Sequence, residues 1–140
     1  MEKYFERLIE LCDIAYKKNE VPVAALIVKD GTIISESFNS RVINNSVLNH
    51  AEIDAINKAE KKIGDWRLDE CDLYVTLKPC SMCESIIKAS RIKNVYYLID
   101  KLDFKKEFNG TSFQQIENEK YSLIIKEKMS NFFTEKRGNK

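Results

Sequence analysis

The sequence contains no long apolar run. No stretch approaches the ~18 apolar residues that a membrane-spanning helix needs, and 44% of the residues are hydrophobic while 32% are charged. Residues 1–7 carry charges of both signs, so they lack the basic-then-apolar layout of a signal peptide. These absences predict a soluble globular protein of the cytoplasm, with no membrane partner.

A large net charge is also missing. The formal net charge is +1, which neither favours nor excludes nucleic acid as a partner. The distribution is uneven, because residues 120–140 hold six Lys or Arg against two Asp or Glu, a net of +4. A basic terminal segment can contact phosphates. A solvated, frayed tail is an equally good interpretation.

Cysteine is scarce, with four in the chain. Disulfides are rare in cytosolic proteins, so these cysteines do not indicate a disulfide framework. Cys12 lies on the apolar stripe of an expected helix, and Cys71 lies just before an expected strand. Both are interpreted as small core residues. Cys80 and Cys83 form a Cys-x-x-Cys pair, which suggests metal or redox chemistry.

Hydrophobic periodicity predicts helices over residues 2–19, about 50–63 and 81 to about 90, and strands over 23–28, 32–38, 73–77 and 95–99. Asp30-Gly31 between the first two strands is a strong hairpin signal. Asn49 is a candidate helix N-cap, and Gly64 suits the position just past a helix end. The strand–helix–strand alternation implies parallel pairing with helices packed on the sheet.

The last part of the chain gives weaker signals. Residues 100–120 are polar with one glycine, residues 121–125 are expected to form a strand, and residues 126–136 a terminal helix. The sequence contains no internal repeat and no low-complexity tract. We therefore expect one domain over residues 1–140.

Two short segments carry chemistry, and each opens an expected helix. Cys80 and Cys83 are three residues apart, so they share a helix face, in a first turn where the helix dipole favours the thiolates that zinc binds. His50 is the only histidine and completes three protein ligands. Three ligands with one open position is the pattern of catalytic zinc. Glu52 is two residues from His50, poorly placed as a fourth ligand but within reach of a bound water, where a general acid–base belongs.

The cysteine pair has two other interpretations. A thioredoxin-like redox motif also has a preceding strand and a following helix. That interpretation leaves His50 and Glu52 unexplained, and it expects the motif early in a larger domain. A structural zinc ribbon needs a second pair of closely spaced ligands, and the sequence has none.

His-x-Glu followed later by Pro-Cys-x-x-Cys is the signature of the zinc nucleobase deaminases. Over about residues 1–99 the chain resembles the bacterial tRNA adenosine deaminase (TadA) type within this superfamily. The matching segments are Glu20–Val23, Asn39, His50–Ile53, Trp66–Leu68, Leu73–Leu77, Pro79–Cys83 and Ser90–Ile92.

This resemblance implies a cytidine-deaminase-like fold, a three-layer α/β/α sandwich with a central mixed sheet. It implies Zn²⁺ held by His50, Cys80 and Cys83, with Glu52 as the catalytic proton carrier. The implied reaction is hydrolytic deamination of the wobble adenosine to inosine in a tRNA anticodon loop. A homodimer in which the RNA touches both subunits is implied as well.

The resemblance also assigns substrate contacts. It implies that Asn39 and the backbone at Ala51 bind the base, with a turn-forming role as the alternative for Asn39. Phe132 and Phe133, with Lys136 and Arg137, resemble the family's C-terminal helix, which helps to hold the anticodon loop. Packing of the two phenylalanines on the core is the favoured alternative.

Trp66 is expected to lie in the core or to cover a helix. Three positions depart from the family pattern: Lys78 stands where an acidic residue is usual, Ala24 where a glycine is usual, and Leu98–Lys101 where a Gly-Ala pair and a Gly-containing loop are usual. These departures bear on the substrate, so a deaminase of a free base or nucleoside, such as guanine or cytosine, remains an alternative.

A catalytically silent subunit that only binds RNA or a partner is a further alternative. Such subunits typically lack the general acid–base residue. The presence of Glu52 therefore argues against it.

Overall fold

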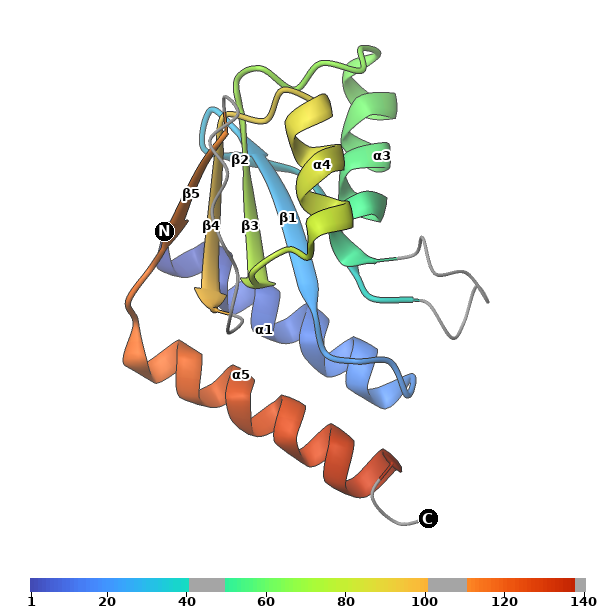
Figure 1. The fold of residues 1–140 in the computed structure, drawn as a ribbon, viewed down its shortest axis with the longest axis vertical. Helices are drawn as coiled ribbons and strands as arrows, with labels where there is room; N and C mark the ends of the chain where they lie inside the picture. The colour runs from blue at the N-terminus through green and yellow to red at the C-terminus, as the bar shows by residue number, and fades with distance from the viewer. Residues whose placement is uncertain (41–49, 101–110, 138–140) are drawn as a thin grey trace.

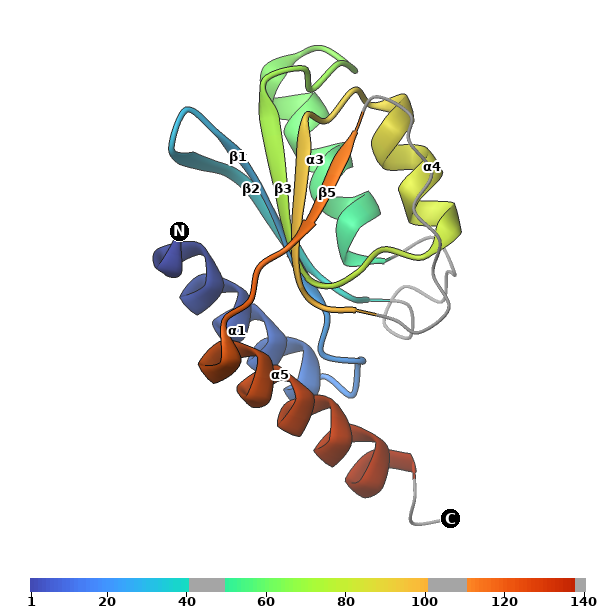
Figure 2. The same cartoon turned by 60° about the vertical axis from the view of Figure 1, so that its left-hand side comes forward.

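The computed structural model describes residues 1–40, 50–100 and 111–137. Five strands form a central sheet in the order β2-β1-β3-β4-β5. Helices α3 and α4 cover one face, and α1 and α5 cover the other (Figures 1 and 2). This arrangement confirms the expected three-layer α/β/α sandwich. Within the described ranges, no helix is long and apolar enough to cross a membrane.

The strands are β1 (Ala24–Lys29), β2 (Thr32–Phe38), β3 (Cys71–Leu77), β4 (Asn94–Ile99) and β5 (Ser112–Gln115). The α-helices are α1 (Glu2–Lys17), α3 (Ala51–Ile63), α4 (Ser81–Ala89) and α5 (Glu119–Phe132), and a π-helical turn over Phe133–Arg137 follows α5. The helices predicted near the N-terminus and in the middle of the chain, and the first four strands, are confirmed with small shifts of their ends.

The sheet is mixed, as expected. β1 pairs antiparallel with β2 and with β3, whereas β3 pairs parallel with β4, and β4 with β5. Asp30 and Gly31, which join β1 to β2, both have positive φ, 51° and 76°. Two such residues form the type of turn that matches the twist of a hairpin, so the Asp-Gly prediction is confirmed. The β3–α4–β4 crossover confirms the predicted parallel pairing.

Alternation along β1 divides its side chains between two cores. Ala25 and Ile27 pack with α3 and α4, while Leu26 packs with α1 and α5. This follows from the two-residue period of a strand, which sends successive side chains to opposite faces. Cys12 and Cys71 are buried in these cores, with exposed fractions of 0% and 1%, which supports their interpretation as small core residues.

The predicted strand over residues 121–125 is wrong, because these residues lie inside α5. Tyr121 and Ile125 are four residues apart, both buried on the helix face toward α1. The Asn118 side chain accepts a hydrogen bond from the Tyr121 backbone N–H at 3.3 Å and so caps the helix. Strand β5 was missed because Phe113 is its only buried residue, too little for a periodic signal.

Candidate active site

Helices α3 and α4 begin next to one another at one end of the sheet (Figure 1). α4 follows β3 directly through the turn Lys78–Cys80. The strand pairings make β2, β3 and β4 run in the same direction, so their carboxyl ends meet at this edge. In α/β sheets, ligands bind outside the carboxyl ends of the strands.

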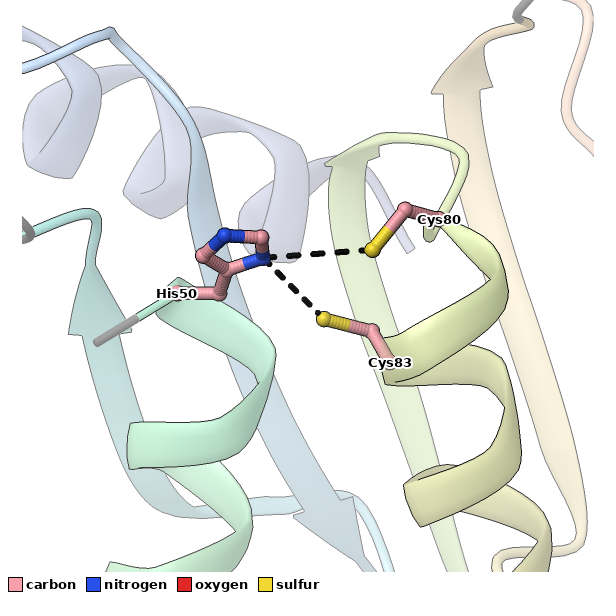
Figure 3. A group of neighbouring side chains, drawn as sticks. All are labelled: His50, Cys80 and Cys83. Atoms are coloured by element: carbon pink, nitrogen blue, oxygen red, sulfur yellow. Dashed lines mark hydrogen bonds between the residues drawn. The ribbon is translucent and has the colours of Figure 1, made fainter. Parts of the chain in front are cut away.

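Three side chains converge where the two helices begin. The His50 Nδ1 atom lies 3.3 Å from the Cys83 Sγ atom and 4.0 Å from the Cys80 Sγ atom (Figure 3). The possible ligand atoms of this group all lie within 4.8 Å of one another. The structure therefore brings together the three residues that the sequence predicts as metal ligands.

Helix-capping geometry frees two of these side chains to point at the centre. His50 is the N-cap residue of α3, with φ −75° and ψ 149°, and Cys80 is the N-cap residue of α4, with φ −70° and ψ 170°. Neither side chain makes a capping hydrogen bond to its own helix. The predicted N-cap, Asn49, lies outside the described residues, and His50 occupies that position.

The donor set fits a zinc ion. Zn–N bonds of ~2.0 Å and Zn–S bonds of ~2.3 Å in tetrahedral geometry separate the donor atoms by about 3.5 Å. The two nitrogen–sulfur distances, 3.3 and 4.0 Å, bracket that value. Three ligands of this kind leave one position open, which distinguishes a catalytic zinc site from a structural one.

Glu52 lies beside this group without belonging to it. Its side chain is buried, with 5% exposed, in the first turn of α3. Burial raises the pKa of the Cys83 thiol above its usual range, and the Glu52 charge raises it further. At Cys83, desolvation therefore outweighs the effect of the helix dipole, which was expected to favour the thiolate. A bound cation reverses this balance, because metal ligation requires the thiolate.

The two residues expected to bind the base lie at the same edge. Asn39 directly follows β2 and is buried, and its backbone N–H donates to the Val23 carbonyl at 2.9 Å. Ala51 is the first residue of α3 and is fully buried. The Ser35 hydroxyl of β2 donates to the Ala55 carbonyl at 2.7 Å, which holds the start of α3 against β2.

The three departures from the family pattern differ in their location. Ala24 and Leu98 are buried in the core under α1 and α5, on the sheet face away from α3 and α4. Lys78, by contrast, lies in the turn before Cys80, 3% exposed, with Nζ 3.6 Å from Asp100 Oδ1. Sequence reasoning noted Lys78 only as a departure. The one sequence signal for a special role of Lys78 was its position, a charged residue between an apolar strand and Pro79.

Two aromatic predictions have different outcomes. Trp66 is 56% exposed, so the prediction of a core position is wrong. Its ring lies near the guanidinium groups of Arg67 and Arg91, at 5.8 and 5.6 Å, and the neighbouring Leu68 takes the buried position instead.

At the C-terminal end of the described chain, Phe132 is buried and its ring lies 6.2 Å from the ring of Tyr16, which supports the packing alternative for this residue. Phe133 is 40% exposed. The side chains of Lys136 and Arg137 lie outside the described part of the chain.

Comparisons with known proteins find relatives that are named deaminases. A curated relative from Rickettsia bellii (strain RML369-C), named tRNA-specific adenosine deaminase, is 46% identical over 91 residues. The match covers 64% of this chain and 63% of that relative, so the chain spans less than two thirds of the relative's length.

Two solved structures share the fold. One comes from studies of A-to-I editing by tRNA:A34 deaminases at the wobble position of transfer RNA. It has a TM-score of 0.74 and 30% identity, and covers 82% of this chain and 98% of that chain. The other is guanine deaminase from Bacillus subtilis, with a TM-score of 0.67, 29% identity, and coverage of 91% and 92%.

The sequence also matches a family model. The model for the MafB19-like deaminases covers residues 1–137, nearly the whole chain. The chain therefore belongs to the MafB19-like deaminase family.

Proposed function

We propose that this protein is a zinc-dependent hydrolytic deaminase that converts the wobble adenosine of a tRNA anticodon loop to inosine. The observation that carries the proposal is the convergence of His50, Cys80 and Cys83, whose ligand atoms lie within 4.8 Å of one another. The buried carboxyl group of Glu52 lies beside this group. This combination matches the requirements of metal-assisted hydrolysis.

His50 Nδ1 and the thiolates of Cys80 and Cys83 would hold the zinc ion. When bound, zinc lowers the pKa of a coordinated water to about 7. His50 and Cys80 present their side chains from the N-cap positions of α3 and α4, and the burial of Cys83 limits access of bulk water.

Glu52 would carry the protons of the reaction. Its carboxylate takes a proton from the attacking water and gives it to ring N1 of the adenine, while the water oxygen bonds to C6. It then takes the remaining hydroxyl proton and gives it to the leaving amino group, so adenosine and water yield inosine and ammonia. Asn39 and the backbone at Ala51 would hold the base edge, since both lie at the edge of the sheet where α3 begins.

Transfer RNA is favoured as the substrate by the names of the relatives with 30% and 46% identity. A base in an anticodon loop is unpaired, which lowers the cost of turning it into a buried pocket. Phe133, which is half exposed at the end of α5, is available to contact the loop, whereas Phe132 is buried. A cytoplasmic homodimer that contacts the RNA with both subunits belongs to the same proposal.

A guanine deaminase is the second candidate. The structure of the Bacillus subtilis guanine deaminase is 29% identical and is covered over 92% of its length. The metal ligands and the proton carrier would serve both reactions. The substrate assay therefore has to distinguish a free base from an RNA base.

The test compares the two substrates directly. The zinc-loaded protein is incubated with an unmodified arginine tRNA transcript with an ACG anticodon, and separately with free guanine. Reverse transcription reads inosine as guanosine, and ammonia release reports guanine turnover. Conversion at the wobble base that is absent in Glu52→Gln supports the proposal. Guanine turnover with an unchanged tRNA supports the second candidate, and activity of Glu52→Gln on either substrate contradicts the role of Glu52.

A further inference from the structure

We propose that Lys78 and Asp100 form a positioning pair that holds Cys80, and thereby the metal site, in place. The inference rests on the proposed metal site, but it does not depend on which base or RNA is the substrate. The two residues lie at the carboxyl ends of the neighbouring parallel strands β3 and β4. Their ion pair joins Nζ of Lys78 to Oδ1 of Asp100 at 3.6 Å.

The two cysteine ligands are held in different ways. Cys83 is inside helix α4 and is fully buried, so the helix and its packing fix the Cys83 side chain. Cys80 is the N-cap residue, in extended backbone conformation, and it is only half buried. The Cys80 carbonyl accepts the Glu84 backbone N–H at 2.8 Å, so α4 holds the carboxyl side of Cys80. The amino side of Cys80 is held by the turn that leads from β3 into α4, and the position of the Sγ atom depends on both.

Lys78 anchors this turn to the end of β4. The last register pair between the two strands joins Leu77 to Ile99. One residue further on, the Lys78 backbone N–H donates to the Ile99 carbonyl at 2.9 Å. The side-chain ion pair with Asp100 comes directly after this bond, and Pro79 then carries the chain to Cys80. Movement at either residue of the pair is thus transmitted to Cys80 through a turn of two peptide bonds.

The surroundings of Lys78 require a partner for its charge. Its side chain is 3% exposed, and the Nζ atom lies 5.7 Å from the centre of the Tyr97 ring. An unpaired charge in such a position is costly, because it has lost its water without gaining an opposite charge. Asp100 supplies that charge while remaining 45% exposed itself. The pair also explains how a lysine is accommodated where the family resemblance leads us to expect an acidic residue.

The measurement is metal affinity, by competition with a chelator, together with the visible spectrum of the Co²⁺-loaded protein. The spectrum reports coordination geometry without any substrate. Asp100→Asn and Lys78→Met are expected to weaken zinc binding about 10- to 100-fold, as for other residues that orient metal ligands, and to change the Co²⁺ spectrum. The double variant Lys78→Glu with Asp100→Lys restores the pair in reverse and should restore both.

Asp13→Asn is the matched control. Asp13 pairs with Lys128 on the opposite layer of the molecule and is 46% exposed, nearly the same as Asp100. This variant should bind metal like the wild type. Lys78→Met keeps the bulk of the side chain and removes its charge, so this variant is expected to fold. Asp100→Asn takes a carboxylate away from the buried Lys78 charge and should lower stability, so its fold is verified by circular dichroism before its metal affinity is compared.

Wild-type affinity and an unchanged spectrum in folded Asp100→Asn would overturn the proposal, because a purely structural pair leaves the metal site unchanged. Failure of the folded charge-reversed double variant to recover would also overturn it. If the wild type itself binds no metal, the proposed metal site is wrong and the positioning role falls with it. If metal binding behaves as expected and tRNA is not converted, only the substrate assignment is wrong.

Discussion

Removal of the metal should lower the stability of the fold by an amount that depends on pH. Helices α3 and α4 meet at the candidate site through His50, Cys80 and Cys83. A ligand that binds only the folded state stabilises it by RT ln(1 + [L]/Kd), which is about 2.7 kcal/mol at a free zinc concentration of 100 Kd. For a chain of 140 residues this corresponds to a rise in Tm of roughly 10 °C.

The pH dependence follows from Cys83. Burial and the Glu52 charge raise the pKa of its thiol above the usual value of 9.0, so Cys83 is protonated at neutral pH in the metal-free protein. Zinc binding must then release at least this proton. Each unit of decrease in pH should weaken zinc binding by about tenfold, which removes about 1.4 kcal/mol of the metal-dependent stability.

Thermal unfolding with buffered zinc and with a chelator, at two pH values one unit apart, measures both effects. The metal-dependent rise in Tm should roughly halve at the lower pH and should disappear in Cys83→Ala. Cys71→Ala is the control, because it also removes a buried thiol, with 1% exposed, but leaves the site intact. A wild-type Tm that is the same with zinc and with chelator would refute the metal site. A rise in Tm that does not fall with pH, or that persists in Cys83→Ala, would refute the role of the Cys83 thiolate.

Three further predictions concern the scaffold. Leu8→Ala, at a fully buried position on the inner face of α1, should cost about 3 kcal/mol of unfolding free energy in urea titration, and a loss below ~1 kcal/mol would contradict the packing. Gly64→Ala should cost about 1 kcal/mol of unfolding free energy, because φ is 80°, a conformation that strains an alanine backbone. An added Cβ meets no atom within 4 Å, so no steric clash adds to this cost. Gly64→Asn should cost less, because asparagine adopts this conformation more readily. The Arg7 hydrogen bond lowers the pKa of Glu36 below 4.5, so Glu36 stabilises the fold above that pH and loses the effect as the pH falls through its folded pKa. Glu36→Gln should therefore cost ~0.5 kcal/mol at pH 7 and nothing in strong acid, and an equal cost at both would contradict the pair.

The sequence predicted the elements whose signals are local. The Asp30-Gly31 turn needs two residues with positive φ, and these residue types adopt that conformation readily. Gly64 at the end of α3 is a similar case, with φ 80° and ψ 25°. The convergence of His50, Cys80 and Cys83 was also predictable, because residue type and spacing limit which side chains can meet at one ion.

The failures arose where tertiary contacts decide the outcome. Residues 121–125 contain two isoleucines in a run of strand length, but Tyr121 and Ile125 pack against α1 four residues apart, which favours a helix. The short strand β5 exists because it pairs with β4, and that partner is not visible in its own residues. Trp66 was expected in the core or over a helix because of its size, although the neighbouring Leu68 is the residue that is buried.

Lys78 illustrates the same limit within the site. Its identity was visible in the sequence, but its partner Asp100 is 22 residues away and is brought close only by the parallel pairing of β3 and β4. Chain position alone could not indicate that the lysine would be buried and paired. This contact is the part of the candidate site that required the structure.

The central claim, hydrolytic deamination of a tRNA wobble adenosine at the His50–Cys80–Cys83 site, is tested most directly by following the oxygen atom. The zinc-loaded protein is incubated with the tRNA in water enriched in heavy oxygen, and the nucleosides of the digested RNA are analysed by mass spectrometry. Our account predicts inosine that contains one heavy oxygen atom, arising at the wobble position and absent with Glu52→Gln. The absence of inosine from a folded, zinc-loaded sample, or inosine without the label, would contradict it.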